Sequence, residues 1–132
     1  MLLKIGIDLD NTITASKESK QFFSTLTTTM SGVAIFYIIT NREQTKKSRK
    51  ETEQELEELD INYDELVITA DKAKYVIDNE ITIYFDDTDE YFANMPSSVT
   101  VFKIREPGNF DFEEKKWFYG DKTGINIDEN RG

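Results

Sequence analysis

Short apolar runs alternate with longer amphipathic stretches along the first hundred residues of the chain. The apolar runs predict buried β-strands over residues 2–9, 33–39, 66–69, 81–85 and 99–104. The stretches between them predict helices over residues 16–30, 43–59, 71–77 and 90–95. Strands that alternate with helices form a parallel sheet with right-handed crossovers. The pattern therefore predicts a doubly wound, three-layer, Rossmann-like α/β fold with strand order 3-2-1-4-5.

The same pattern makes predictions for individual side chains. Ser16 is a predicted N-cap of the first helix, because a serine there can accept a hydrogen bond from the first turn. The third helix is expected to bury an apolar stripe of Ala73, Val76 and Ile77. Five aromatic residues are assigned to the core: Phe22, Phe23, Phe36, Tyr37 and Phe85.

A chain of 132 residues predicts one domain. Residues 1–120 are assigned to this domain and residues 121–132 to a loose C-terminal tail. There is no apolar run long enough for a membrane span and no signal-peptide pattern at the start, so a cytoplasmic location without membrane contact is expected.

Composition narrows the possible chemistry. The chain has no histidine, which excludes serine–histidine–carboxylate hydrolysis, histidine-ligated zinc and imidazole acid–base catalysis. It also has no cysteine, so thiolate chemistry and disulfides are excluded. The formal net charge of −10 disfavours binding of a long nucleic acid. Carboxylates, lysine, arginine and hydroxyls remain as the groups that can do chemistry.

Polar clusters follow three of the predicted strands. The first strand ends in Asp8-Leu9-Asp10-Asn11-Thr12, the second in Thr40-Asn41-Arg42 and the fourth in Asp86-Asp87. In parallel sheets the functional residues lie beyond the carboxyl ends of the strands, near the point where strand order reverses. Each cluster alone also fits an ordinary polar turn. Together they predict a shared site, and adjacent aspartates favour a hard cation such as Mg²⁺.

The order of these clusters, with a lysine between the second and the last, resembles the four-motif signature of the haloacid dehalogenase superfamily over residues 5–89. The resemblance implies a phosphomonoester hydrolase in which Asp8 is the nucleophile and Asp10 the acid and base. It implies that Thr40 binds a phosphoryl oxygen beside a lysine. The implied Mg²⁺ ligands are the Asp8 carboxylate, the Asp10 main-chain carbonyl and the Asp86-Asp87 pair, of which either aspartate could be the direct ligand. Candidates for binding the substrate are Thr12, Asn41 and Arg42.

Two lysines compete for the position beside the phosphate. Lys72 and Lys74 both lie near the start of the third helix, and two residues apart on a helix they point to different faces. Lys72 is preferred, because Asp71-Lys72-Ala73 resembles a stretch of nucleotidase-like members of the superfamily. The alternative is that both are surface lysines.

The spacing of the motifs also bears on substrate access. About 30 residues separate Asp10 from Thr40, and a similar number separate Thr40 from Lys72. One helix and one strand fill each gap, which leaves no room for a cap domain. The expected member is capless, with an open site for a nucleotide or another small phosphomonoester, and a homo-oligomer is one way to cover such a site. The alternatives are a catalytically weak binding domain of the same family and a phosphorelay receiver domain.

Overall fold

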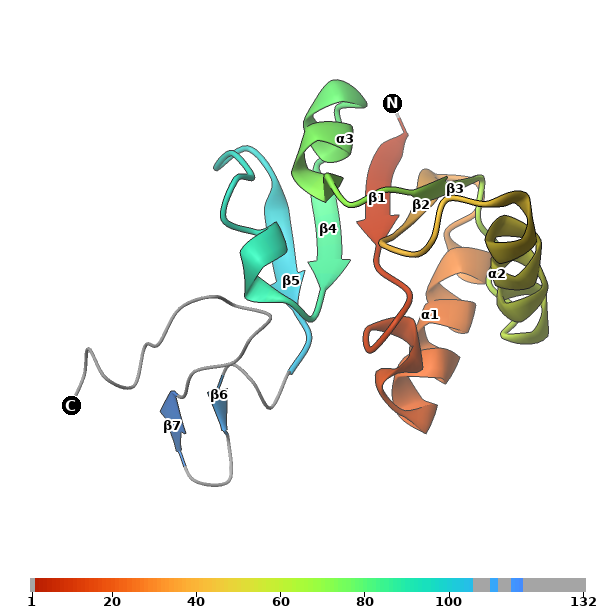
Figure 1. The fold of residues 1–132 in the computed structure, drawn as a ribbon, viewed down its shortest axis with the longest axis horizontal. Helices are drawn as coiled ribbons and strands as arrows, with labels where there is room; N and C mark the ends of the chain where they lie inside the picture. The colour runs from red at the N-terminus through yellow and green to blue at the C-terminus, as the bar shows by residue number, and fades with distance from the viewer. Residues whose placement is uncertain (1, 106–109, 112–114, 118–132) are drawn as a thin grey trace.

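The computed structural model describes residues 2–105, 110–111 and 115–117. Within them, a five-stranded sheet is covered by three α-helices (Figure 1). The strands of the sheet are β1 (Leu3–Ile7), β2 (Ala34–Thr40), β3 (Glu65–Ile68), β4 (Ile83–Asp86) and β5 (Thr100–Lys103). The helices are α1 (Lys17–Thr29), α2 (Lys46–Glu58) and α3 (Lys72–Asp78), with 3₁₀ turns η1 (Ile13–Ala15) and η2 (Asp89–Tyr91). A separate antiparallel pair comprises β6 (Phe110–Asp111) and β7 (Lys116–Trp117).

The order of the strands is β3-β2-β1-β4-β5, and all four neighbouring pairs are parallel. The predicted doubly wound α/β fold is therefore confirmed. The central strand is β1, whose Ile7 lies opposite Ile38 of β2 and Phe85 of β4. This strand is the point at which the order reverses, so the carboxyl ends of β2, β1 and β4 meet at one place.

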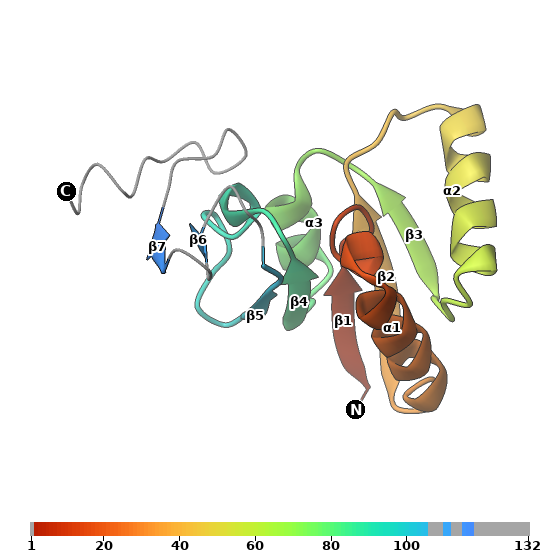
Figure 2. The same ribbon diagram turned by 90° about the horizontal axis from the view of Figure 1, so that it is seen from below.

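The core has two layers, one on each face of the sheet. Phe23 of α1 and Leu56 of α2 are buried in the first layer, and Val76 of α3 is buried in the second. Figure 2 shows the positions of these three helices around the sheet. The strands contribute alternate residues to the two layers, as Ile38 and Ile39 of β2 show. Burial on both faces explains why the central strands are continuous apolar runs in the sequence.

Two predicted core residues are exposed. Phe22 is 52% exposed and Ile77 is 49% exposed, so their assignment to the core and to the apolar stripe was wrong. Each is adjacent to a residue that is buried, Phe23 or Val76. Successive helical positions point about 100° apart, so one residue of each pair faces the sheet and the other faces solvent.

The capping residues determine where the first two helices begin. Ser16 accepts a hydrogen bond from the backbone N–H of Ser19, which confirms the predicted N-cap of α1. Thr45 caps α2 in the same way, so this helix begins at Lys46 and not at residue 43. The helix predicted over residues 90–95 was wrong: the chain forms the 3₁₀ turn η2 and then further turns, because its hydrogen bonds join residues three apart.

Of the helices in the described residues, none has the length and apolar character needed to cross a membrane. The predicted tail over residues 121–132 lies outside the described residues.

Candidate active site

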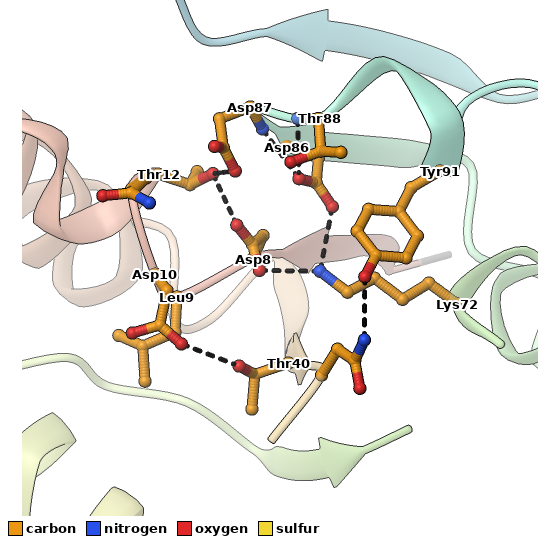
Figure 3. Close-up of polar contacts among 12 residues, drawn as sticks. Asp8, Leu9, Asp10, Thr12, Thr40, Lys72, Asp86, Asp87, Thr88 and Tyr91 are labelled. Carbon is orange, nitrogen blue, oxygen red and sulfur yellow. Dashed lines mark hydrogen bonds and ion pairs between the residues drawn. The ribbon is translucent and has the colours of Figure 1, made fainter. Parts of the chain in front are cut away.

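The polar clusters predicted from the sequence converge at the carboxyl ends of three adjacent strands. Asp8 follows β1, Thr40 ends β2 and Asp86 ends β4. Because β1 lies between the other two strands, their side chains point toward a common space (Figure 3). Parallel pairing therefore brings together residues that lie up to 78 positions apart in the sequence.

Three carboxylates form the centre of this space. Asp8, Asp86 and Asp87 each offer an oxygen atom, and these atoms all lie within 4.8 Å of one another. All three residues are buried. The carboxylate of Asp10 is not part of this group, because it turns toward Arg42. The expectation that the main-chain carbonyl of Asp10 binds a cation stays a prediction.

Lys72 is the cation of the cluster. Its Nζ atom lies 2.7 Å from Asp8 Oδ1 and 3.0 Å from Asp86 Oδ2, and its side chain is only 2% exposed. Asp71 caps the start of α3 by accepting from the backbone N–H of Lys74. Lys74 itself pairs with Asp78 on the surface. The structure thus places Lys72, and not Lys74, among the carboxylates.

The two adjacent aspartates differ in how fully their oxygens are used. Asp86 accepts from Lys72, from the Tyr84 hydroxyl and from the backbone N–H groups of Asp87 and Thr88. Asp87 Oδ2, in contrast, is buried and has no hydrogen-bond partner among the described residues. A buried carboxylate oxygen without a donor is costly, and a bound cation would satisfy it.

Thr12 lies behind the nucleophile candidate. Its hydroxyl is 2.8 Å from Asp8 Oδ2 and 3.3 Å from Asp87 Oδ1, and the residue is fully buried. Thr12 therefore orients two carboxylates, and it does not line the open part of the site. The sequence motif located this threonine, but the role it suggested was contact with the substrate.

The electrostatics of the cluster favour uptake of positive charge. Burial raises the pKa of Asp8 to about 8, against the opposing effect of the Lys72 ammonium, and burial also raises the pKa of Asp86. Burial lowers the pKa of Lys72, but the carboxylates of Asp8 and Asp86 outweigh it, and the net pKa is raised. Lys72 therefore stays charged, and the raised pKa values of Asp8 and Asp86 show that this buried group resists carrying more negative charge without a proton or a cation. The oxygen donors present fit a hard divalent cation.

Asp10 and Arg42 form a second polar group at the edge of the site. Arg42 Nε and Nη2 bind the two oxygens of Asp10 at 2.9 and 2.6 Å, and Nη2 also lies 2.9 Å from Glu55 Oε1. Hydrogen bonding from Arg42 lowers the pKa of Asp10. The Thr40 hydroxyl lies 3.5 Å from Asp10 Oδ2. Arg42, predicted to bind substrate, is thus engaged with Asp10 and Glu55, and it does not line the open space.

A hollow of about 200 Å³ opens above these residues. It is lined by Asp8, Asp10, Asn11, Thr40, Asn41, Lys72, Asp87, Thr88, Glu90 and Tyr91. The predicted residues Asp8, Asp10, Thr40, Asn41, Lys72 and Asp87 therefore share one cavity, with Asp86 directly beneath it.

Two tyrosines of the site were missed by sequence reasoning. The ring of Tyr91 covers Lys72, with its centroid 4.2 Å from Nζ, and its hydroxyl accepts a hydrogen bond from Asn41 Nδ2 at 3.0 Å (Figure 3). Tyr91 lies in a 3₁₀ turn, where no periodic pattern could have indicated it. Tyr84 precedes Asp86 by two residues on β4, so the alternation of strand faces could have placed the two side by side.

Comparisons with protein-family models, with curated proteins and with solved structures give no match for this chain. The chemistry of the site is therefore inferred from its own residues.

Proposed function

We propose that this protein is a Mg²⁺-dependent phosphomonoester hydrolase that uses Asp8 as its nucleophile, and that it belongs to the haloacid dehalogenase superfamily. The observation that carries the proposal is the buried group of Asp8, Asp86 and Asp87 with Lys72 hydrogen-bonded to the first two. One oxygen of this group, Asp87 Oδ2, has no partner among the described residues. Phosphoryl transfer relies on positioning and charge stabilisation more than on a strong base, so a site without histidine can support it.

The oxygens most available to a cation belong to Asp8 and Asp87. Asp86 already accepts four hydrogen bonds, which suits it to hold Lys72 and the backbone of the turn in place. Mg²⁺ usually takes one or two carboxylates and keeps several waters, in agreement with such a donor set. When bound, Mg²⁺ would supply positive charge to a phosphoryl group and to the carboxylates around it.

In the proposed reaction, Asp8, Lys72 and Thr40 each have a distinct role. An oxygen of Asp8 forms a bond to phosphorus while the bond from phosphorus to the ester oxygen breaks, which gives an aspartyl-phosphate and an alcohol. A water oxygen then bonds to phosphorus, and the bond to Asp8 breaks to release phosphate. We assign the binding of phosphoryl oxygens to Lys72 and the Thr40 hydroxyl, and the lining of the hollow by both residues with Asp8 supports this.

Asp10 is the candidate for moving protons in these steps. Its pairing with Arg42 favours the ionised form, which suits Asp10 to accept a proton from the attacking water. To donate a proton to the leaving oxygen, Asp10 must first gain one, which requires the contact with Arg42 to loosen.

The decisive experiment compares wild type with Asp8→Asn on p-nitrophenyl phosphate in the presence of Mg²⁺. We expect the substitution to lower kcat by several orders of magnitude, because no carboxylate remains to attack phosphorus. Asp60→Asn is the matched control, since Asp60 is an exposed residue outside the site with a positive φ that asparagine accepts. Wild type quenched in acid should carry a phosphoryl group on Asp8, detectable by mass spectrometry.

Equal turnover by wild type and Asp8→Asn would contradict the proposal. Mg²⁺ binding without turnover across a broad set of phosphomonoesters would instead favour a binding domain of the same family.

A further inference from the structure

A second hollow adjoins the candidate active site. It has a volume of about 290 Å³ and extends over the start of α3, where Asp71 and Ala73 line it. The two hollows share four lining residues, Asn41, Lys72, Glu90 and Tyr91. The two hollows are therefore neighbours along these residues, so a molecule bound at Asp8 lies next to the second space.

Tyr91 and Asn41 form the boundary between the two hollows. The Tyr91 hydroxyl accepts a single hydrogen bond from Asn41 Nδ2, and this bond is exposed to solvent. The bond joins residues that are 50 positions apart and come from separate elements, the end of β2 and the turn η2. An exposed hydrogen bond can exchange with water at low cost, so substrate groups can replace it.

The charge of the second hollow is negative. Asp71 and Glu90 line it as exposed carboxylates, and Asn94 adds an amide. Lys72 is the one cation among the described residues that line either hollow, and its ammonium is bound by Asp8 and Asp86. A second phosphate or a carboxylate on the substrate would meet repulsion here, whereas a hydroxyl or an ammonium would find acceptors.

On the basis of the proposed phosphohydrolase function, we propose that this hollow binds the organic part of the ester and selects monophosphate esters of neutral or positively charged, polar alcohols. Asp71 and Glu90 discriminate against esters that carry a further anionic group. The ring of Tyr91 and the amide of Asn41 contact the organic part where it leaves the phosphate. Tyr91 is thus a specificity-determining residue.

The experiment uses two substrates of the same size and different charge. Glycerol 1-phosphate ends in a hydroxymethyl group and 3-phosphoglycerate ends in a carboxylate, on an otherwise similar three-carbon frame. We expect kcat/KM of the full chain with Mg²⁺ to be at least tenfold higher for glycerol 1-phosphate. In the double variant Asp71→Asn/Glu90→Gln the ratio should fall toward one. Glu80→Gln, which removes an exposed charge at the other end of α3, should leave the ratio unchanged.

Equal kcat/KM for the two esters in wild type, with p-nitrophenyl phosphate turned over, would overturn the charge selection and leave the phosphohydrolase function intact. Absence of turnover for all three substrates would overturn the function instead. In that case calorimetric titration of the two three-carbon esters measures the same ratio as a ratio of Kd values, and equal Kd values would overturn the inference.

Two substitutions test the role of Tyr91 separately. Tyr91→Phe keeps the ring and removes the hydrogen bond with Asn41, so KM for glycerol 1-phosphate should change by less than threefold. Tyr91→Ala removes the ring, and KM should rise at least fivefold with a smaller change in kcat. An unchanged KM in Tyr91→Ala would show that the ring does not contact the organic part.

Discussion

Lys72 at the centre of the site and Arg42 at its edge differ in burial and in their carboxylate partners. Lys72 is buried, and its ammonium has two carboxylate partners, Asp8 and Asp86. Removing one partner of a buried ion pair leaves an uncompensated charge, which is strongly destabilising. Arg42 is more exposed and joins Asp10 to Glu55 of α2. Lys72 thus secures the centre of the site, and Arg42 sets the protonation of the residue at its edge.

The Arg42–Asp10 pair yields a prediction about protonation. Arg42 lowers the pKa of Asp10 mainly through its hydrogen bonds, so Arg42→Met should raise this pKa. The carboxyl ¹³C chemical shift of Asp10, followed by NMR from neutral to acidic pH, measures the change. Because the pKa is lower in the folded than in the unfolded state, the pair stabilises wild type at neutral pH. This stabilisation is lost as pH falls through the folded pKa.

Arg49→Met serves as the control for this prediction, since Arg49 lies on α2 and donates to the backbone carbonyl of Leu66, away from Asp10. An Asp10 pKa that is identical in Arg42→Met and wild type would show that Arg42 does not set it.

At the scale of the elements, the packing of the central strand β1 in the second core layer affects a residue that supports the site. Gly6 lies on this strand opposite Tyr84 of β4. A Cβ atom at Gly6 would lie 2.9 Å from Tyr84 Cδ1 and 3.1 Å from Ile39 Cδ1, closer than packed carbon atoms normally approach. The hydroxyl of Tyr84 donates to Asp86. The small residue on β1 therefore makes room for a ring that holds one of the buried carboxylates.

We predict that Gly6→Ala lowers the free energy of unfolding by about 1–3 kcal/mol, because the ring of Tyr84 has to shift within a packed core. Gly32→Ala is the matched control: a Cβ there meets nothing within 4 Å. It should leave stability unchanged or raise it by about 0.4–1 kcal/mol, through the unfolded chain. Urea denaturation of the two variants and wild type measures the difference. An equal effect of the two substitutions would mean that the second layer has space at Gly6.

At the scale of the whole molecule, the buried carboxylates link stability to protons and cations. The chain carries a formal net charge of −10, and three of its acidic residues meet in one buried cluster. The pKa of Asp8, about 8 in the folded protein against 3.8 as the ordinary value, means that the folded protein binds a proton that the unfolded chain releases. Between these two pH values the metal-free protein therefore loses stability as pH rises.

Mg²⁺ should reverse this loss. A cation at Asp8 and Asp87 displaces the bound proton, so the increase in Tm caused by Mg²⁺ should itself grow as pH rises from about 5 to about 8. Thermal denaturation with Mg²⁺ and with a chelator, across this range, measures the increase. In Asp8→Asn the pH-dependent part should largely disappear. An increase that is the same at every pH, or that persists in Asp8→Asn, would contradict the link between the cation and this carboxylate.

Much of the framework follows from local patterns in the sequence. Continuous apolar runs indicated strands buried on both faces, and Asp8, Thr40 and Asp86 were located because each stands where such a run ends. Lys72 was preferred over Lys74 from a short resemblance, and its burial agrees with that choice. These features depend on residues that are neighbours along the chain. The periodicity of apolar positions and the end of a strand can be recognised from such neighbours alone.

Tertiary structure alone decided how the side chains are partnered. The sequence suggested that Arg42 and Thr12 contact the substrate, but Arg42 binds Asp10, 32 positions away. Thr12 joins Asp8 to Asp87, which follow β1 and β4, two strands that become neighbours only in the sheet. Tyr91 covers Lys72 from the turn η2, and a turn has no periodic pattern in the sequence that could indicate this contact. A hydrogen bond or an ion pair is chosen by distance and direction between elements. These depend on how the sheet and helices pack, so no local pattern can specify them.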